Sequence, residues 1–435
     1  MSAVGERIRI EGIAASGAGV GRLADGRAIF VHRTAPGEIV EATIREEKKR
    51  WARGELLRVI EPSPERRTAP CPHYDRCGGC TLEHLEYGAQ LRAKHAIVAE
   101  TLRRIGGIGI DDGGLHLPPV VPSPSEFQYR NRVSFTLLRL GGDRVVVGFH
   151  EIERPGRIVD ITGECLLPEP AIATAWDRIR AEWGRGAHRL PSGRRLRLTL
   201  RATLMGEVAL TIEGGYGPGR PAELLERVPE LTAVWHRPGS KRADRPPHLL
   251  AGKETITERW GAEEIGVRGT AFLQVNRGAA ELLEAHLLEL IGDPAGLRIV
   301  DAYAGIGLRV RHLARKGAEV VGIELDPTAT EIAREGAPPN AEFVEGRVEE
   351  HLADHLPADL VVLNPPRTGL DEVVPELLRG APPRRLIYVS CDPATLARDL
   401  RRLGDRFRIG SMMSFDLFPQ TAHLETVVEL ICDTT

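Results

Sequence analysis

The sequence of 435 residues predicts a chain of three parts: a small β-barrel, an α+β central domain and a doubly wound α/β sheet. Three observations predict this organisation. Short segments with alternating polar and apolar residues, separated by Gly-rich turns, fill about the first 60 residues, and longer strand patterns dominate residues 127–260. From about residue 265, apolar strands alternate with amphipathic helices. We therefore expect domains at 1–62, 63–262 and 263–435.

The composition narrows the class of protein. The formal net charge is −3, so any contact with nucleic acid has to come from local basic patches. The chain has no apolar run of about 18 residues that would predict a membrane span. The N-terminal stretch MSAVGERIRIEGI lacks the pattern of a signal peptide. We expect a monomeric, cytoplasmic protein that does not associate with membranes.

The first domain carries a basic hairpin tip. GERIRIEGI, RAIFVH, EIVEATI and GELLRVIEP alternate as half-buried strands do, which predicts a small barrel. Between the last two strands, Lys48, Lys49, Arg50 and Arg53 surround Trp51. Cations beside an aromatic ring suit an RNA backbone and a stacked base. They equally suit a solvated hairpin tip, and the residues alone do not decide between these interpretations.

Cysteines cluster after the Pro-rich linker EPSPERRTAP. Three of them, Cys71, Cys77 and Cys80, lie within ten residues. In a reducing cytosol such a cluster suggests metal ligation rather than disulfides. The remaining cysteines are far apart along the chain: Cys165, Cys391 and Cys432.

The periodicities of the second and third parts predict their elements. A helix is expected at 86–106, and YRNRVSFTLL, RVVVGFH, RRLRLTLRATL and EVALTIEGG predict strands, with helices at 171–183 and 221–228. Further along, the helix NRGAAELLEAHLLELIG precedes the strands LRIVDAY, AEVVGIEL, AEFVEG, ADLVVLNPP and RRLIYVSC, which have helices between them. The last two strands, FRIGSMMSFDLF and HLETVVELIC, predict a terminal hairpin.

The turn DAYAGIG predicts a cofactor site. It places Gly305 in a Gly-x-Gly sequence between a strand and a helix, where a backbone without side chains lets a ligand approach. Glu324 ends the next strand and could accept both hydroxyls of a ribose. The turn lacks the third Gly of the dinucleotide fingerprint and a phosphate-binding Lys, which favours S-adenosylmethionine over NAD or ATP. The alternative for Glu324 is a stabilising charge at a helix N-terminus.

YVSCDPATLARDL and DLFPQTAHLETVVEL predict the chemistry. Cys391 follows a strand and precedes a helix, a position at which ligands bind in open α/β sheets and at which the helix N-terminus favours a thiolate. Glu425 lies after a turn, although it could also be the polar face of a strand. A thiolate that adds to carbon 6 of uracil makes carbon 5 nucleophilic toward the methyl group of S-adenosylmethionine, and a carboxylate then takes the carbon-5 proton.

LNPPRTGL follows another strand end. Asn-Pro-Pro is typical of methyltransferases that act on base amines, which place an aromatic residue fourth. Here the fourth residue is Arg367, which cannot stack as a flat ring does. We interpret the stretch as a wall shared by cofactor and uracil, with Arg367 as a partner of a phosphate or a carboxylate.

Four motifs in order, DAYAGIG, LNPPRTGL, YVSCDPATLARDL and DLFPQTAHLE, resemble the RNA 5-methyluridine methyltransferase family. The resemblance covers most of the chain and implies a Rossmann-like class I methyltransferase domain at 263–435. For 63–262 it implies a central domain that carries an iron–sulfur cluster and binds RNA. The first 60 residues resemble the TRAM RNA-binding barrel, and CPHYDRCGGCTLEHLEYGAQL resembles the family's iron–sulfur segment. YRNRVSF and FLQVN also match the family.

Carried over to this sequence, the resemblance implies Cys391 as nucleophile and Glu425 as base. It implies that the contacts to S-adenosylmethionine come from four further residues: Gln274, Tyr303, Glu324 and Asn364. It also implies a 4Fe–4S cluster with a structural role, held by Cys71, Cys77, Cys80 and Cys165. Zinc also accepts four cysteines, but C-x5-C-x2-C is unusual zinc spacing.

Three residues depart from the family pattern: Leu308, Arg347 and Asn364, which stands where Asp is usual. They put in doubt the fine geometry of cofactor binding but not the pair of Cys391 and Glu425, and they motivate a second hypothesis, an RNA-binding or folding protein with a weakened methyltransferase site. A third hypothesis is methylation of cytosine carbon 5 or of a base amine. As target we prefer 23S ribosomal RNA, because branches with both the barrel and the iron–sulfur segment mostly modify it, over the T-loop of transfer RNA.

Overall fold

The computed structural model describes residues 5–110, 114–239, 247–260, 263–269, 271 and 273–433. They fold as two compact units. Unit 1 contains residues 1–10, 21–86 and 125–277, and unit 2 contains residues 11–20, 87–124 and 278–435. This grouping cuts across the expected consecutive segments, because residues 87–124 belong with the C-terminal part of the chain.

The N-terminal part is a closed five-stranded barrel in the order β1-β2-β3-β5-β4, as the alternation predicted. Its core consists of small and branched apolar residues that point inward from alternate positions, among them Ile8, Ile29 and Val40. Of the predicted basic tip, Lys48, Lys49 and Arg50 lie between β4 and β5, which pair antiparallel, whereas Trp51 and Arg53 belong to β5. The strands are β1 (Glu6–Ile13), β2 (Gly19–Arg22), β3 (Ala28–Val31), β4 (Ile39–Glu47) and β5 (Trp51–Glu61).

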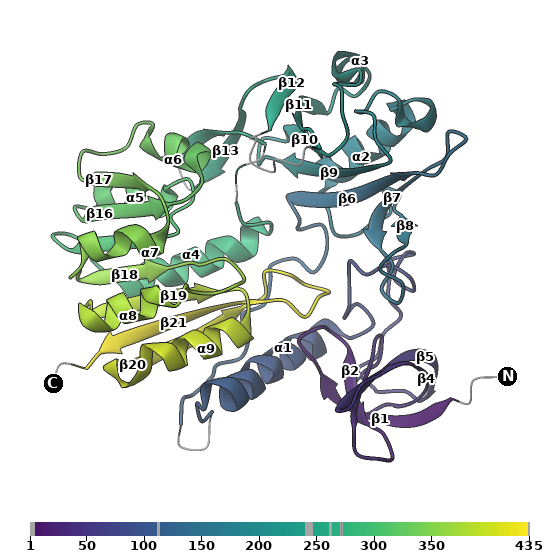
Figure 1. Ribbon diagram of the computed structural model, residues 1–435, viewed down its shortest axis with the longest axis horizontal. Coiled ribbons are helices and arrows are strands. Elements are labelled where there is room, and N and C mark those ends of the chain that lie inside the picture. Colours follow the sequence, from purple (N-terminus) through teal and green to yellow (C-terminus); the bar gives the residue numbers. More distant parts are fainter. Residues whose placement is uncertain are drawn as a thin grey trace. The chain divides into compact units, whose positions relative to one another are not determined.

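The central part has a seven-stranded sheet in the order β12-β11-β10-β9-β6-β7-β8 and a separate hairpin, β13-β14. Apolar residues at alternate positions of β6 and β9 pack against α2 and α3 on one face of the sheet. This confirms the predicted mixture of strands and two helices (Figure 1). The strands are β6 (Arg132–Arg139), β7 (Val145–His150), β8 (Ile158–Asp160), β9 (Arg195–Ala202), β10 (Val208–Glu213), β11 (Leu231–Arg237), β12 (His248–Gly252), β13 (Ile256–Trp260) and β14 (Glu263–Val267), and the helices are α2 (Pro170–Glu182), η2 (Arg185–Ala187) and α3 (Pro221–Arg227).

The C-terminal part has a seven-stranded sheet in the order β17-β16-β15-β18-β19-β21-β20. The first five strands in this order are parallel, while β21 runs antiparallel to β19 and β20, as the predicted terminal hairpin requires. The strands are β15 (Arg298–Ala302), β16 (Glu319–Glu324), β17 (Ala341–Glu345), β18 (Leu360–Leu363), β19 (Arg385–Ser390), β20 (Phe407–Phe415) and β21 (Glu425–Cys432).

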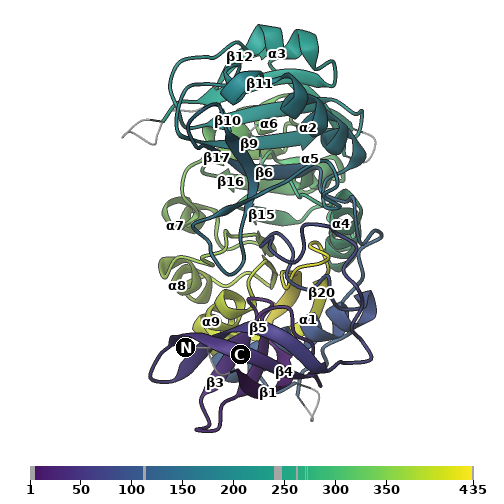
Figure 2. The same ribbon diagram turned by 90° about the vertical axis from the view of Figure 1, so that its right-hand side faces the viewer.

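Helices cover both faces of this sheet (Figures 1 and 2). One apolar core contains residues of α1, α8 and α9, and the other contains residues of α4, α5 and α6. Strands buried on both faces are continuous apolar runs, as in LVVL of β18, whose four residues are all buried. The helices are α1 (Tyr87–Thr101), η1 (Leu102–Gly106), α4 (Arg277–Ile291), α5 (Leu308–Arg315), α6 (Pro327–Arg334), α7 (Val348–His351), η3 (Leu352–His355), α8 (Val373–Gly380), α9 (Pro393–Leu403) and η4 (Gly404–Arg406).

Within the described residues, no helix combines the length and the apolar character that crossing a membrane would need.

Candidate active site and cysteine cavity

Five of the seven predicted catalytic and cofactor-binding residues lie at one edge of the unit 2 sheet. The register pairs Ala302 with both Ile323 and Leu363, and Leu363 with Tyr388, so β15, β16, β18 and β19 end together. The residues at or just after these ends therefore share the edge where open α/β sheets bind ligands. They are Tyr303, Gly305, Glu324, Asn364 and Cys391.

The glycine turn after β15 has the backbone expected of a cofactor cradle. Tyr303 has φ +68°, a left-handed conformation that costs energy for a residue with a side chain and is concentrated at functional sites. Gly305 has φ +59°, and a Cβ built there would meet no atom within 4 Å, so its backbone faces open space. At Gly307 a Cβ would lie 2.5 Å from the Phe343 ring, so only glycine fits this turn.

Glu324 is held by the backbone around it. Its Oε2 accepts a hydrogen bond of 2.8 Å from the Gly305 N–H, and its Oε1 accepts one of 2.8 Å from the Asp326 N–H. The N-cap of α6 is Asp326, which accepts from Thr328 and Ala329. Asp326 thus performs the capping role that was the alternative for Glu324, and Glu324 remains as a fixed carboxylate beside the glycine turn.

Cys391 lies half-buried between β19 and α9. Asp392 caps α9 by accepting from the backbone N–H groups of Ala394 and Thr395, both at 2.9 Å. Burial, followed by the charge of Glu425, raises the pKa of the Cys391 thiol to about 11, while Arg367 acts in the opposite direction. The free protein therefore does not show the thiolate that we expected from the helix N-terminus, because desolvation and a neighbouring carboxylate oppose it.

Glu425 is the first residue of β21 and is 5% exposed. Ser390 pairs with Thr426 across β19 and β21, so the next position along each strand brings Cys391 and Glu425 together. Burial raises the pKa of Glu425 to about 8, and the charge of Arg367 lowers it. Arg367, an exposed residue of the loop after β18, is thus the cation that acts on both groups.

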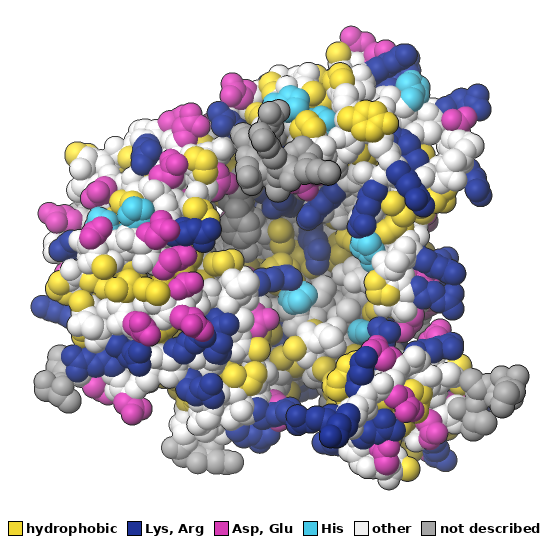
Figure 3. Space-filling model, viewed as in Figure 1, with side chains coloured by type: hydrophobic (Ala, Val, Ile, Leu, Met, Phe, Trp, Pro, Cys, Tyr) yellow, Lys and Arg dark blue, Asp and Glu magenta, His cyan; other side chains and the backbone are white. Residues whose placement is uncertain are grey.

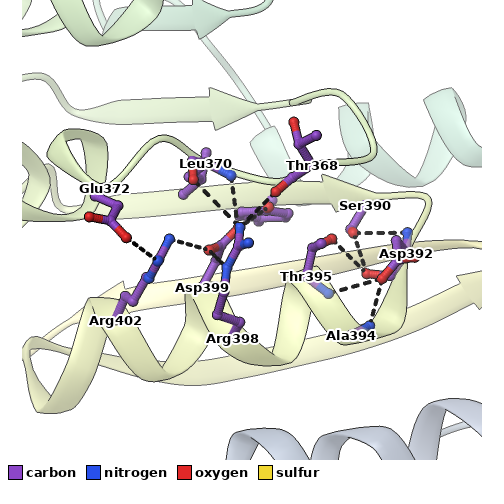
Figure 4. Close-up of polar contacts among 11 residues, drawn as sticks. Thr368, Leu370, Glu372, Ser390, Asp392, Ala394, Thr395, Arg398, Asp399 and Arg402 are labelled. Carbon is purple, nitrogen blue, oxygen red and sulfur yellow. Dashed lines mark hydrogen bonds and ion pairs between the residues drawn. The ribbon is translucent and has the colours of Figure 1, made fainter.

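That loop is tied to α9 through Asp399, a fully buried residue that the sequence reasoning missed (Figure 4). One Asp399 oxygen accepts from the Leu370 N–H at 2.8 Å and from the Tyr388 hydroxyl at 3.0 Å. Arg398 bonds the other oxygen at 2.9 Å and the Thr368 carbonyl at 2.8 Å. The only sequence signal was an acidic residue in the buried stripe of an amphipathic helix.

A second network fixes the segment before Glu425. Lys94, on α1, donates to Asp416 Oδ1 at 2.5 Å and to the Phe418 carbonyl at 3.1 Å. Gln90 exchanges two hydrogen bonds with Gln420, at 2.9 and 3.0 Å. Lys94, Asp416, Gln90 and Gln420 all have no exposed surface. The apolar spacing of residues 86–106 predicted this helix but not its bonds to the segment before Glu425.

Three further residues were singled out in the sequence: Gln274, Arg347 and Leu308. Gln274 belongs to unit 1, and its backbone carbonyl accepts a hydrogen bond of 2.9 Å from the Asn131 side-chain amide. Phe272, in the same FLQVN stretch, lies outside the described residues. Arg347 is exposed and pairs with Glu349 at 3.4 Å. Leu308 is the first residue of α5 and is half-buried.

Unit 1 brings the other four predicted cysteines to one cavity. Cys71, Cys77, Cys80 and Cys165 line it together with Phe127 and Phe149. The Gly79 N–H lies 3.3 Å from the Cys77 sulfur, and burial raises the pKa of all four thiols. Within the described ranges, no group of three or more His, Cys, Asp or Glu side chains converges as ligands of a metal ion.

Comparison with known proteins agrees with this arrangement. Residues 342–432 match the tRNA (uracil-5-)-methyltransferase family, and residues 5–57 match the TRAM domain. An uncharacterised RNA methyltransferase of Gloeobacter violaceus is 35% identical, with 97% of this chain and 95% of the relative covered. One of Halalkalibacterium halodurans is 32% identical, with 97% and 96% covered.

Among solved structures, the Pyrococcus abyssi tRNA (uracil-54, C5)-methyltransferase in complex with S-adenosyl-L-homocysteine superposes with a TM-score of 0.73. It is 26% identical, and the match covers 98% of this chain and 100% of that one.

Proposed function

Because the chain belongs to the S-adenosylmethionine-dependent RNA methyltransferases of the uracil-5 family, we propose that it methylates carbon 5 of one uridine in RNA through a covalent adduct with Cys391. The observation that carries the proposal is the pairing of Cys391 with Glu425 at the ligand-binding edge of the sheet. A protein that only bound or folded RNA would need neither group, and amine methylation would not need the cysteine.

The residues of unit 2 suit the cofactor. The open backbone at Gly305 leaves room for the amino-acid end of S-adenosylmethionine, and Glu324, held by two N–H groups, is free to accept the ribose hydroxyls. Tyr303 and Asn364 flank this space from the ends of β15 and β18. When bound, the cofactor supplies the methyl group as an electrophile.

Cys391 and Glu425 then divide the reaction between them. The Cys391 thiolate forms a bond to carbon 6, and the uracil electron pair moves to carbon 5, which takes the methyl group. Glu425 removes the proton from carbon 5, the electrons return to the ring, and the bond between carbon 6 and sulfur breaks. The methyl group replaces one hydrogen, and the proton passes from Glu425 to solvent.

Arg367 offsets the charge that builds up in this site. Both acids hold their protons near neutral pH in the free protein, since the pKa values are about 11 and about 8. A nearby guanidinium favours the charged forms that the reaction uses. Nucleoside mass spectrometry of RNA methylated by the protein would identify 5-methyluridine, and the finding of 5-methylcytidine or an N-methylated base would overturn the assignment.

For the target we propose 23S ribosomal RNA. The TRAM barrel and the cysteine cavity together support this choice, because the sequence resembles the branch that carries both. The Pyrococcus neighbour acts on transfer RNA, which makes the T-loop uridine the second candidate. With tritiated cofactor and both RNAs, we expect label in 23S RNA, and label confined to transfer RNA would reverse the order.

We also propose a 4Fe–4S cluster in the unit 1 cavity. In such a cluster each thiolate binds a different iron, so the four sulfurs line a cavity rather than converge on one point, and an N–H beside the Cys77 sulfur suits an iron-bound thiolate. With four protein ligands no iron is open to substrate, which makes the role structural. Anaerobic purification should give a brown protein with iron and acid-labile sulfide, whereas a colourless protein with one zinc would contradict this.

A further inference from the structure

Gln274 lies in the stretch of chain between β14 and α4, and the sequence resemblance implies that it contacts S-adenosylmethionine. We call residues 274–276 the QVN segment. No described residue between β14 and α4 belongs to a helix or a strand, although Asn276 forms an isolated bridge with Arg130. The position of Gln274 therefore depends on the residues that hold the QVN segment from outside.

Asn131, the residue before β6, makes two of the bonds to the QVN segment. Its side-chain Nδ2 donates to the Gln274 carbonyl at 2.9 Å, and its backbone N–H donates to the Val275 carbonyl, also at 2.9 Å. Asn131 is 1% exposed. Two bonds from one buried residue to successive carbonyls fix both the place and the direction of the backbone at Gln274.

The side-chain amide of Asn131 leaves one of its own groups unbonded in this arrangement. Its Oδ1 is buried and has no hydrogen-bond partner in the described part of the chain. A carbonyl only accepts, so the Nδ2 group has to face Gln274 and the amide cannot turn to satisfy its oxygen elsewhere. Buried acceptors without partners are costly and rare in native proteins. This cost indicates that the bond to Gln274 does more than stabilise unit 1.

The backbone around Asn131 is held on two sides. The N–H of Ala202, the last residue of β9, donates to the Asn131 carbonyl at 2.8 Å. The N–H of Arg130 donates to the Leu167 carbonyl at 2.9 Å, and the Arg130 carbonyl accepts from the Glu169 N–H at 2.9 Å. Leu167 lines the cysteine cavity. Asn131 is thus anchored both to the central sheet and to the wall of that cavity.

Arg277 holds the end of the QVN segment at which α4 begins. Its guanidinium donates to Glu169 and Glu258, at 3.1 and 2.6 Å, and also to the Ala202 carbonyl. Ala202 is the residue whose N–H bonds the Asn131 carbonyl. The two residues that flank the segment in space are therefore tied to one point at the end of β9.

We propose that Asn131 is a positioning residue that holds Gln274 where it meets the cofactor. The proposal rests on the proposed function, which supplies S-adenosylmethionine as the ligand. Asn131 acts through the backbone of Gln274 and does not touch the cofactor. A segment that is already fixed loses little conformational freedom when the ligand binds. Without the Nδ2 donor, only a fraction of the molecules would hold Gln274 in place, and the apparent affinity would fall by that fraction.

Asn131→Ala in the full-length protein tests this by calorimetric titration with S-adenosylhomocysteine. RNA is left out of the titration, because Lys and Arg side chains lie over β6 and β9 in Figure 3, at the place that Figure 1 labels. We expect binding to weaken about tenfold, which is the scale of one lost buried hydrogen bond. Ser134→Ala is the matched control and should bind as wild type, since it removes a 2.8 Å contact with Thr199 and nothing from the QVN segment.

A double-mutant cycle with Gln274→Ala separates positioning from a general loss of structure. If Asn131 acts through Gln274, Asn131→Ala should cost much less affinity in the Gln274→Ala background, because the side chain that it positions is gone. Equal losses in both backgrounds overturn the proposal, and so does wild-type affinity of a folded Asn131→Ala protein. If Asn131→Ala folds poorly, Asn131→Asp keeps the size of the side chain and removes the same donor, and the same cycle decides.

The outcomes are independent of the methylation chemistry. A non-additive cycle supports the role of Asn131 even if the protein methylates no uridine. Additive losses in a protein that forms 5-methyluridine overturn this role and leave the proposed function in place. If neither Gln274→Ala nor Asn131→Ala changes the affinity, Gln274 is not a cofactor contact and the proposal is wrong.

Discussion

The Lys94 ammonium lies 2.5 Å from Asp416 Oδ1, and neither side chain has any exposed surface. The pair joins α1 to the segment that leads into Glu425, over 322 positions of the chain. Removal of one member of a buried pair leaves the other as an uncompensated charge, which costs about 3–5 kcal/mol. We expect Lys94→Met to lower the free energy of unfolding by about this amount in urea titrations.

The double variant Lys94→Met/Asp416→Leu should recover much of that loss, because no buried charge remains. Lys316→Met, at an exposed site of the same unit, should change stability by less than about 0.5 kcal/mol. Equal stability of Lys94→Met and the Lys316 control would show that the pair is not buried in solution.

Asp399→Asn should loosen the loop that carries Arg367. Asp399 accepts from Leu370 N–H and the Tyr388 hydroxyl and pairs with Arg398, and hydrogen bonds to a charged group contribute about 1.5–3 kcal/mol each. We expect a lower melting temperature and a lower kcat. Tyr388→Phe removes one of these bonds and keeps the charge, so its effect should be clearly smaller. If both variants behaved alike, the carboxylate charge would not be what fixes the loop.

Glu425→Gln should stop the reaction after methyl transfer. The amide cannot take the proton from carbon 5, so the bond between Cys391 and carbon 6 persists. We expect a protein–RNA adduct that survives denaturing electrophoresis and requires S-adenosylmethionine. Cys391→Ala should form neither adduct nor product, whereas Cys432→Ala, at the far end of β21, should behave as wild type. Product from Cys391→Ala would end the covalent mechanism.

The methylation rate should rise with pH through about 8. Burial raises the pKa of Glu425 to about 8, so its base form is the minor one below that pH, and the thiolate of Cys391 is scarcer still. Arg367 lowers both pKa values, so Arg367→Gln should move the pH profile of kcat/KM to higher pH. The variant should therefore lose activity near neutral pH and regain part of it in alkaline buffer. Arg379→Gln, at an exposed site on α8, should leave the profile in place.

Local patterns predicted the architecture because each depends on near neighbours in sequence. Alternation gave the barrel strands, the period of 3.6 gave α4, and the terminal hairpin gave the reversed β21. The Gly-rich turn and the ends of β18 and β19 were identified from motifs, and the sheet register then brought Asn364 and Cys391 to one edge.

Features that depend on distant partners were not predictable in this way. Lys94 lies in a helix with no clear apolar face, and only the folded chain brings it to Asp416. The opposition of Arg132 and Arg201 depends on strand register, which neither segment specifies alone. The pKa of Cys391 is raised because burial and the charge of Glu425 outweigh the helix N-terminus, which the sequence indicated and which favours a thiolate.

The discontinuity of unit 2 affects how the protein can be made. A ribosome synthesises α1 long before Asp416. During most of translation the Lys94 ammonium therefore has no Asp416 carboxylate to pair with, and it must stay in water. The buried contact of α1 with Asp416 therefore has to wait until the C-terminal segment has been made. A fragment that starts at residue 263 would contain every strand of the catalytic sheet and still expose the Asp416 and Gln420 surface. To cover that surface, the fragment needs α1, which lies in the unit 2 segment 87–124.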